Sequence, residues 1–290
     1  MVRLGIRLAM AGALGALLCA CGTTSGSMAI VRGHDGSEHH EIAELPRLFP
    51  ELAQLREAAL ASAAVYQDIP VTEKLTGVLP PQWEEDTDLP RTKVDGKRQT
   101  PDLTYRLWVN RQSSPPVALL AFRGTHIPAD WISNLRWFGA SIGIEDHYEQ
   151  TERVTADIIN VIRERYGPQT KIVTTGHSLG GGLAQTAAYR SCGAVTTVFA
   201  FDSTPVTRHR TAKGCDGRPN DFFRVFEQSE ILSYARFIVR LALGLREKEP
   251  RITEIKVHLF NGIFVTAHSM QDLATKLVGE LPQQQTAAVP

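Results

Sequence analysis

The sequence predicts an α/β protein with a mostly parallel central sheet that is covered by helices on both faces. From residue 103 onwards, short apolar runs of strand length alternate with longer segments of helical periodicity. Runs such as VALLAF at 117–122 lack the polar alternation of a half-exposed strand, which is typical of strands buried on both faces. Strands and helices in alternation form parallel strands joined by helical crossovers.

Each expected element follows from a local pattern. Leucines and alanines recur every three or four residues between Leu48 and Tyr66, which predicts a helix. Prolines and charges at 80–101 indicate a surface loop. Asp146 followed by Glu149 indicates a capped helix start. The expected strands are 103–109, 117–122, 171–175, 196–201, 222–226 and 252–260, and the further helices are 146–166, 178–190, 234–248 and 269–279.

Size and charge bound the class of protein. The chain has 290 residues, of which 43% are hydrophobic, so it can bury one substantial core. The 31 lysines and arginines balance the 31 aspartates and glutamates, which gives a formal net charge of zero. A nucleic-acid-binding domain carries a basic footprint, and no nucleic-acid partner is therefore expected.

The N-terminus indicates export. Arg3 and Arg7 form a short positive region before an apolar stretch at 8–18 that is too short to span a bilayer comfortably. The sequence LCACG at 18–22 resembles the signal of bacterial lipoproteins. That resemblance implies cleavage before Cys21, lipidation of its thiol and anchoring at a membrane of the cell envelope. An ordinary secretory signal, with Cys21 incidental and the protein secreted, is the alternative.

The predicted division of the chain has four parts. They are a signal peptide at 1–20, a lipidated tether at 21–45, the folded domain at 46–282 and a short tail at 283–290. The tether is rich in glycine, serine and charge, and its histidines are interpreted as solvated linker rather than metal ligands.

The cysteines of the body leave two readings open. Outside the cytoplasm, Cys192 and Cys215 either form a disulfide or remain separate thiols, because sequence supplies no geometry. No Cys-x-x-Cys pair or His/Cys cluster points to zinc, so no metal site is expected.

A nucleophile is predicted at Ser178. The sequence Gly176-His177-Ser178-Leu179-Gly180 fits G-x-S-x-G, and it follows an apolar strand and precedes a helix. Such a turn exposes the serine hydroxyl, while the helix N-terminus offers backbone N–H groups to a developing oxyanion. The N–H of Leu179 is the first expected donor. A glycine-rich turn without chemistry is the alternative.

A second motif lies upstream of this turn. The apolar strand ends in Phe-Arg-Gly-Thr at 122–125, and residues 126–138 then contain Asp-Trp and further apolar residues. With GHSLGG, this order resembles the class 3 (fungal-type) lipase family over about residues 105–268. The resemblance implies an α/β-hydrolase fold, Thr125 as the second oxyanion donor, and a lid that contains Trp131, Ile132 and Leu135. These apolar residues read equally well as core.

The base and the acid should follow the nucleophile in chain order. His268 precedes the last helix, where the family places its base, whereas His258 lies in an alternating run typical of a strand face. Glu230 stands where the family has an aspartate, and the resemblance implies that it orients the imidazole. Asp202, at the end of an expected strand, is the alternative acid.

These features predict a serine hydrolase that cleaves carboxylic esters of lipids through an acyl-enzyme, without a cofactor. The residues do not decide between triacylglycerol and phospholipid, although a membrane-tethered enzyme meets phospholipids first. From another class, a catalytically silent module that binds lipid or protein on the same fold is the alternative. A lipid ester and a membrane surface are the expected partners.

Overall fold

The computed structural model describes residues 28–33, 36–66, 79–89, 103–124, 142–203, 221–228, 252–260 and 269–282. Several residues and segments singled out in the sequence lie outside these ranges, so the roles expected for them remain predictions. They are Cys21, Thr125, Trp131, Ile132, Leu135, Cys215, Glu230, His268 and the expected helix at 234–248.

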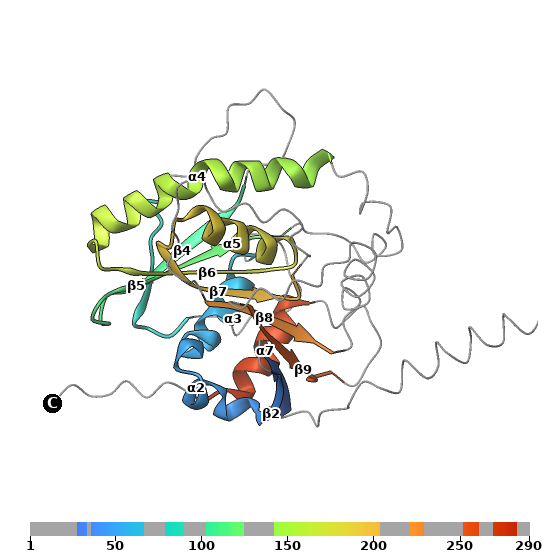
Figure 1. Ribbon diagram of the computed structural model, residues 1–290. Coiled ribbons are helices and arrows are strands. Elements are labelled where there is room, and N and C mark those ends of the chain that lie inside the picture. Colours follow the sequence, from blue (N-terminus) through green and yellow to red (C-terminus); the bar gives the residue numbers. More distant parts are fainter. Residues whose placement is uncertain are drawn as a thin grey trace, which may run out of the picture.

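The described residues form one nine-stranded sheet with the order β2-β1-β9-β8-β7-β6-β5-β4-β3 (Figure 1). The five strands from β5 to β9 run parallel, while β3 and β4 at one edge and β1 and β2 at the other pair antiparallel. The mostly parallel sheet is thereby confirmed. The strands are β1 Met28–Arg32, β2 Ser37–Glu41, β3 Trp83–Glu85, β4 Tyr105–Asn110, β5 Val117–Phe122, β6 Lys171–His177, β7 Val195–Phe201, β8 Asp221–Glu227 and β9 Ile252–Val257.

Helices cover both faces of this sheet, as the sequence predicts. Strand β5 is buried along its whole length, and its side chains alternate between two cores. Leu119 packs with α3 (Leu55–Ala64) and α7 (Met270–Glu280), whereas Leu120 packs with α4 (Ile142–Tyr166) and α5 (Leu179–Arg190). Figure 1 shows these two helical layers on opposite sides of the strands. The arrangement is the α/β-hydrolase fold class.

Helix boundaries differ from the prediction at two places. The single helix expected from Leu48 to Tyr66 is divided into α2 (Leu45–Leu48), a 3₁₀ turn and α3. Pro50 explains the break, because the residue before a proline avoids helical geometry, and Phe49 is extended at φ −124°. Helix α4 begins four residues before Asp146, which is therefore not its cap. Within the described ranges, no helix combines the length and hydropathy needed to cross a membrane.

The segment interpreted as a tether, 21–45, contains two strands of the sheet. Strand β1 pairs with β9, and β2 pairs with β1, so the described sheet already begins at Met28. Ala29 and Val31 are buried against the core, which is the alternation that a five-residue strand can show. Strand β2 reads as linker because an edge strand carries polar and charged side chains. Likewise, the loop expected at 80–101 contains the short edge strand β3.

Cys192 lies in the turn after α5 and has a φ of 52°. It is disulfide-bonded. The other three cysteines all lie outside the described residues, so the Cys192–Cys215 pairing stays a prediction.

Glu57 is a carboxylate buried inside the core beneath the sheet. It belongs to α3, its exposed fraction is 0%, and among the described residues neither carboxylate oxygen has a hydrogen-bond partner. Burial raises the pKa of the Glu57 carboxyl above its ordinary value of 4.5, because desolvation outweighs the opposing influence of the residue's own backbone and of the Arg56 charge. The folded protein therefore binds a proton at Glu57 more tightly than the unfolded chain does.

We expect the free energy of unfolding to fall as pH rises from about 4.5 through the raised pKa of Glu57, because the folded state then ionises a buried group. Glu57→Leu should remove this slope and stabilise the protein by about 1–3 kcal/mol at pH 8. Urea unfolding at a series of pH values measures both effects. Glu164→Gln, an exposed position on α4, is the control and should leave the slope unchanged. An identical slope in Glu57→Leu would contradict the assignment.

Candidate active site

Ser178 occupies a sharp corner between β6 and α5. Its backbone has φ 56° and ψ −122°, a conformation that residues with side chains rarely adopt. The Ser178 N–H donates to the Phe201 carbonyl at 3.0 Å, and the Ser178 carbonyl accepts from Gly181 and Gly182 at 3.1 and 3.3 Å. The side chain makes no capping bond to the helix. The turn is thus fixed by its backbone, which leaves the half-buried hydroxyl available for chemistry.

Two glycines permit this corner. A Cβ on Gly180 would overlap the carbonyl oxygen of Phe122 and lie 2.9 Å from the Gly124 nitrogen. A Cβ on Gly176 would overlap the Gly180 backbone. Backbone therefore packs directly on backbone where α5 crosses the ends of β5 and β6, as the G-x-S-x-G pattern predicts.

Gly180→Ala should destabilise the fold by about 1–3 kcal/mol and lower the reactivity of Ser178, because the new methyl group forces the start of α5 away from β5. Thermal unfolding and the rate of fluorophosphonate labelling measure the two effects. Gly279→Ala, in α7, is the matched control. A Cβ there meets nothing within 4 Å, so a slightly higher unfolding temperature is expected. Equal behaviour of the two variants would refute the tight contact.

Asp202, the alternative acid, follows β7 directly beside the nucleophile strand. The pairing of His177 with Phe201 places Ser178 and Asp202 at the same level of neighbouring strands. Asp202 is completely buried and has a φ of 39°. Its Oδ1 accepts the Glu227 N–H at 2.9 Å, on the side of β8. One carboxylate oxygen of Asp202 is thus already hydrogen-bonded to the backbone at the end of β8.

Glu227 and His258 form an acid–imidazole pair that sequence reasoning does not identify. Glu227 ends β8 with 0% exposure. Its Oε2 accepts the Leu259 N–H at 2.9 Å, and its Oε1 lies 3.5 Å from His258 Nδ1. Asp202, Glu227 and His258 therefore link the ends of β7, β8 and β9. The only signal in the sequence is a carboxylate at the end of a buried strand.

His258 is poorly placed to take the Ser178 proton. Two strands separate β6 from β9, so three inter-strand spacings, about 14 Å, lie between their ends. A general base has to approach within about 3 Å, which two short side chains do not achieve across that span. His258 is placed as the partner of Glu227, and the preferred base, His268, lies outside the described residues.

The end of β5 lies against the nucleophile turn. Phe122 pairs with Gly176, and Gly124 is the last described residue before Thr125. The Gly124 N–H donates to the Tyr66 hydroxyl at 2.9 Å. Burial raises the pKa of Tyr66 to about 12, so the phenol is neutral at neutral pH. The sequence pattern marks Tyr66 only as the end of an expected helix, and no local signal indicates this contact.

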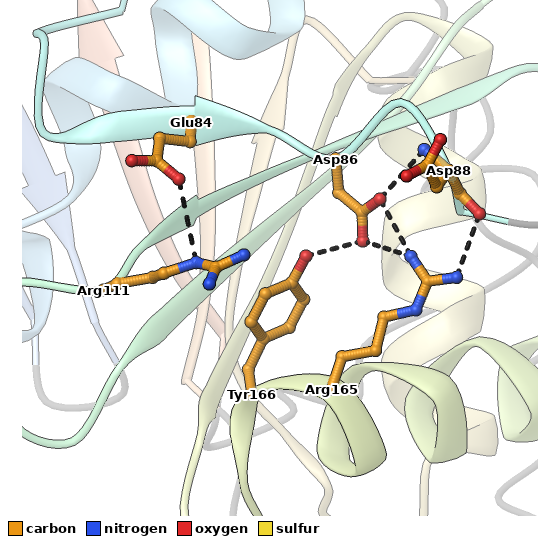
Figure 2. Close-up of polar contacts among 6 residues, drawn as sticks. All are labelled: Glu84, Asp86, Asp88, Arg111, Arg165 and Tyr166. Atoms are coloured by element: carbon orange, nitrogen blue, oxygen red, sulfur yellow. Dashed lines mark hydrogen bonds and ion pairs between the residues drawn. The ribbon is translucent and has the colours of Figure 1, made fainter.

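A second polar cluster joins the segment after β3 to the end of α4, near the start of the parallel strands (Figure 2). Asp86 accepts from Tyr166 at 2.6 Å and from Arg165 at 2.8 and 2.9 Å, beside a hollow of about 420 Å³. Desolvation would raise the pKa of Asp86, but the hydrogen bonds from Tyr166 and Arg165 hold it below its usual value. The cluster fastens the end of α4 to the segment after β3. The Asp86 carboxylate is already hydrogen-bonded to these two side chains, and the cluster lies at the end of the sheet away from Ser178.

One family model matches the part of the chain that contains Ser178. Residues 57–212, more than half of the chain, match the family model described as "Phospholipase-like: Tle-like phospholipase domain". No curated protein matches the chain.

Three solved structures are distantly similar. Lipase II from Rhizopus niveus is 16% identical over 64% of this chain and 75% of its own, with a TM-score of 0.44. Lip2 lipase from Yarrowia lipolytica is 20% identical over 64% and 74%, with a TM-score of 0.42. A bacterial heroin esterase is 13% identical over 83% and 93%, with a TM-score of 0.31.

Proposed function

The chain belongs to the Tle-like phospholipase domain family, and from this premise we propose that it hydrolyses carboxylic esters of lipids through an acyl-enzyme on Ser178. The observation that carries the proposal is the strained turn at Ser178, held by backbone hydrogen bonds at the N-terminus of α5. Backbone strain of this kind persists only where the surrounding structure imposes it, and it is concentrated at active sites.

The proposed reaction has two halves. Ser178 Oγ attacks the ester carbonyl while His268 removes its proton, and Glu230 orients the imidazole. The N–H groups of Leu179 and Thr125 stabilise the oxyanion. The imidazolium then protonates the leaving alcohol, and the same imidazole activates the water that hydrolyses the acyl-enzyme. Leu179 supports this scheme because it opens α5, where the first N–H groups lack partners within the helix.

A phospholipid is the favoured substrate. The family is described as phospholipase-like, and the lipoprotein-type signal at Cys21 would hold the enzyme at a bilayer. In this proposal Trp131, Ile132 and Leu135 form the lid over the acyl chains. A catalytically silent binding module on the same fold would retain the turn at Ser178 but would not need a reactive hydroxyl there.

Wild-type protein should be labelled by a fluorophosphonate probe and release fatty acid from phosphatidylcholine vesicles, because both reactions need an activated serine. Ser178→Ala should abolish labelling and reduce release by about 10⁴-fold or more. Labelling is read by mass spectrometry, and released fatty acid is compared between phospholipid vesicles and triolein emulsion. Ser113→Ala, in the turn between β4 and β5, is the control.

The outcomes separate the candidate functions. Absence of labelling in folded wild-type protein would favour the silent binding module. Cleavage of short soluble esters alone would contradict the lipid substrate, and faster release from triolein would overturn the preference for phospholipid.

Three carboxylates can be compared as the triad acid. Glu230→Gln should lower kcat by about 10⁴-fold with little change in KM, because the imidazole loses the carboxylate that fixes its tautomer. Asp202→Asn keeps an oxygen acceptor for the Glu227 N–H and should cost far less. Glu227→Gln should chiefly lower stability, since it replaces a buried carboxylate that accepts the Leu259 N–H and contacts His258. A larger loss of kcat in Asp202→Asn than in Glu230→Gln would reassign the acid.

A further inference from the structure

We infer that Tyr66 is a positioning residue of the proposed ester-cleaving site, and that its phenol oxygen holds the end of β5 in place against the nucleophile turn. The inference rests on the proposed function, because it concerns the segment that leads into the expected oxyanion donor Thr125. Tyr66 follows α3, more than fifty residues before that segment, and is almost fully buried.

Tyr66 takes the place of a strand neighbour. Along β5, backbone groups pair with β4 on one side and with β6 on the other. Beyond Phe122, the Arg123 N–H still donates to the Thr104 carbonyl at 3.0 Å. The next donor in the chain, the Gly124 N–H, is bound instead by the Tyr66 hydroxyl at 2.9 Å. A side chain therefore sets the direction in which the chain leaves the sheet.

The same phenol lies beside the nucleophile turn. A Cβ built on Gly124 would be 2.7 Å from both the Tyr66 hydroxyl oxygen and the His177 carbonyl oxygen. Both oxygens therefore pack closely against Gly124 on the side where a side chain would lie. The rings of Tyr66 and His177 also meet edge to face, with centroids 6.4 Å apart at 71°. His177 directly precedes Ser178. Tyr66 thus contacts both strand ends that supply the proposed oxyanion site.

Docking of α3 does not depend on this hydroxyl. Ser62 bonds the Thr175 hydroxyl at 2.7 Å, and Thr175 also donates to the Ala58 carbonyl. Arg106 donates to the Ala64 carbonyl at 2.9 Å. With the helix fastened to β4 and β6 by these bonds, a phenylalanine at position 66 keeps the ring contact and removes only the acceptor for Gly124.

The consequence is catalytic because oxyanion donors act only at about 2.7–3.1 Å from the developing charge. Losing one donor outright typically costs about 10²–10³-fold in rate, and an imprecisely aimed donor costs part of that. Tyr66→Phe should therefore lower kcat by about 10–100-fold and leave KM within about twofold, since substrate binding away from the carbonyl is unchanged.

The experiment compares Tyr66→Phe with Tyr189→Phe in the full chain. Tyr189 is equally buried but lies near the far end of α5, stacked on Phe222 with centroids 4.9 Å apart. Both variants are assayed for fatty-acid release from phosphatidylcholine vesicles, for the second-order rate of fluorophosphonate labelling and for thermal unfolding. Tyr66→Phe should lose kcat and labelling rate together, whereas Tyr189→Phe should keep both.

A Tyr66→Phe variant that folds and is labelled at the wild-type rate would overturn the inference and leave Ser178 as the nucleophile. Wild-type protein that resists labelling would overturn the proposed function instead. Should Tyr66→Phe fail to fold, amide exchange in [¹⁵N]glycine-labelled wild-type protein decides. Slow exchange at Gly124 supports the hydrogen bond to the phenol, and exchange at the rate of an exposed amide contradicts it.

Discussion

The site depends on one contact between two pieces of backbone. The first turn of α5 crosses the end of β5 so closely that Gly180 has no room for a side chain between itself and the Phe122 carbonyl. Because a methyl group would already separate the two elements, helix and strand keep a fixed spacing. Ser178 at the start of that helix and Gly124 at the end of that strand are therefore positioned relative to each other by steric exclusion. The strained backbone of Ser178 is a consequence of that spacing.

The end of the sheet where Ser178 lies also buries two acidic side chains completely. Asp202 and Glu227 are both fully buried at neighbouring strand ends, and a lone carboxylate in such surroundings is costly. Backbone N–H groups offset that cost, since Glu227 donates to Asp202 and itself accepts from Leu259. These bonds join β7, β8 and β9 beyond the point where the regular ladder ends. The loops that leave these strands thus start from fixed positions, which a catalytic acid and base require.

The features that the sequence predicts are those that local pattern specifies. Apolar runs and helical periods identify the parallel strands and covering helices, and glycine spacing identifies the corner at Ser178. The hairpin of β1 and β2 is missed because an edge strand such as SEHHE carries the composition of a linker. Tyr66 and Glu227 are missed for another reason. Their partners lie 58 and 32 residues away, and no local signal marks such contacts.

The two edges of the sheet differ in what their polar groups do. At the edge where the parallel strands begin, the Asp86 carboxylate binds Arg165 and Tyr166 from α4. Its oxygens are therefore used to hold α4 against the segment after β3. At the opposite edge, the Ser178 side chain caps no helix, and the turn that presents it is fixed by backbone hydrogen bonds and by the close contacts of Gly176 and Gly180. A hydroxyl that contributes no cap to the helix beneath it, on a backbone held in strain, is what nucleophilic catalysis requires and what packing alone does not explain. That asymmetry supports the proposed placement of the chemistry at the carboxyl ends of the parallel strands.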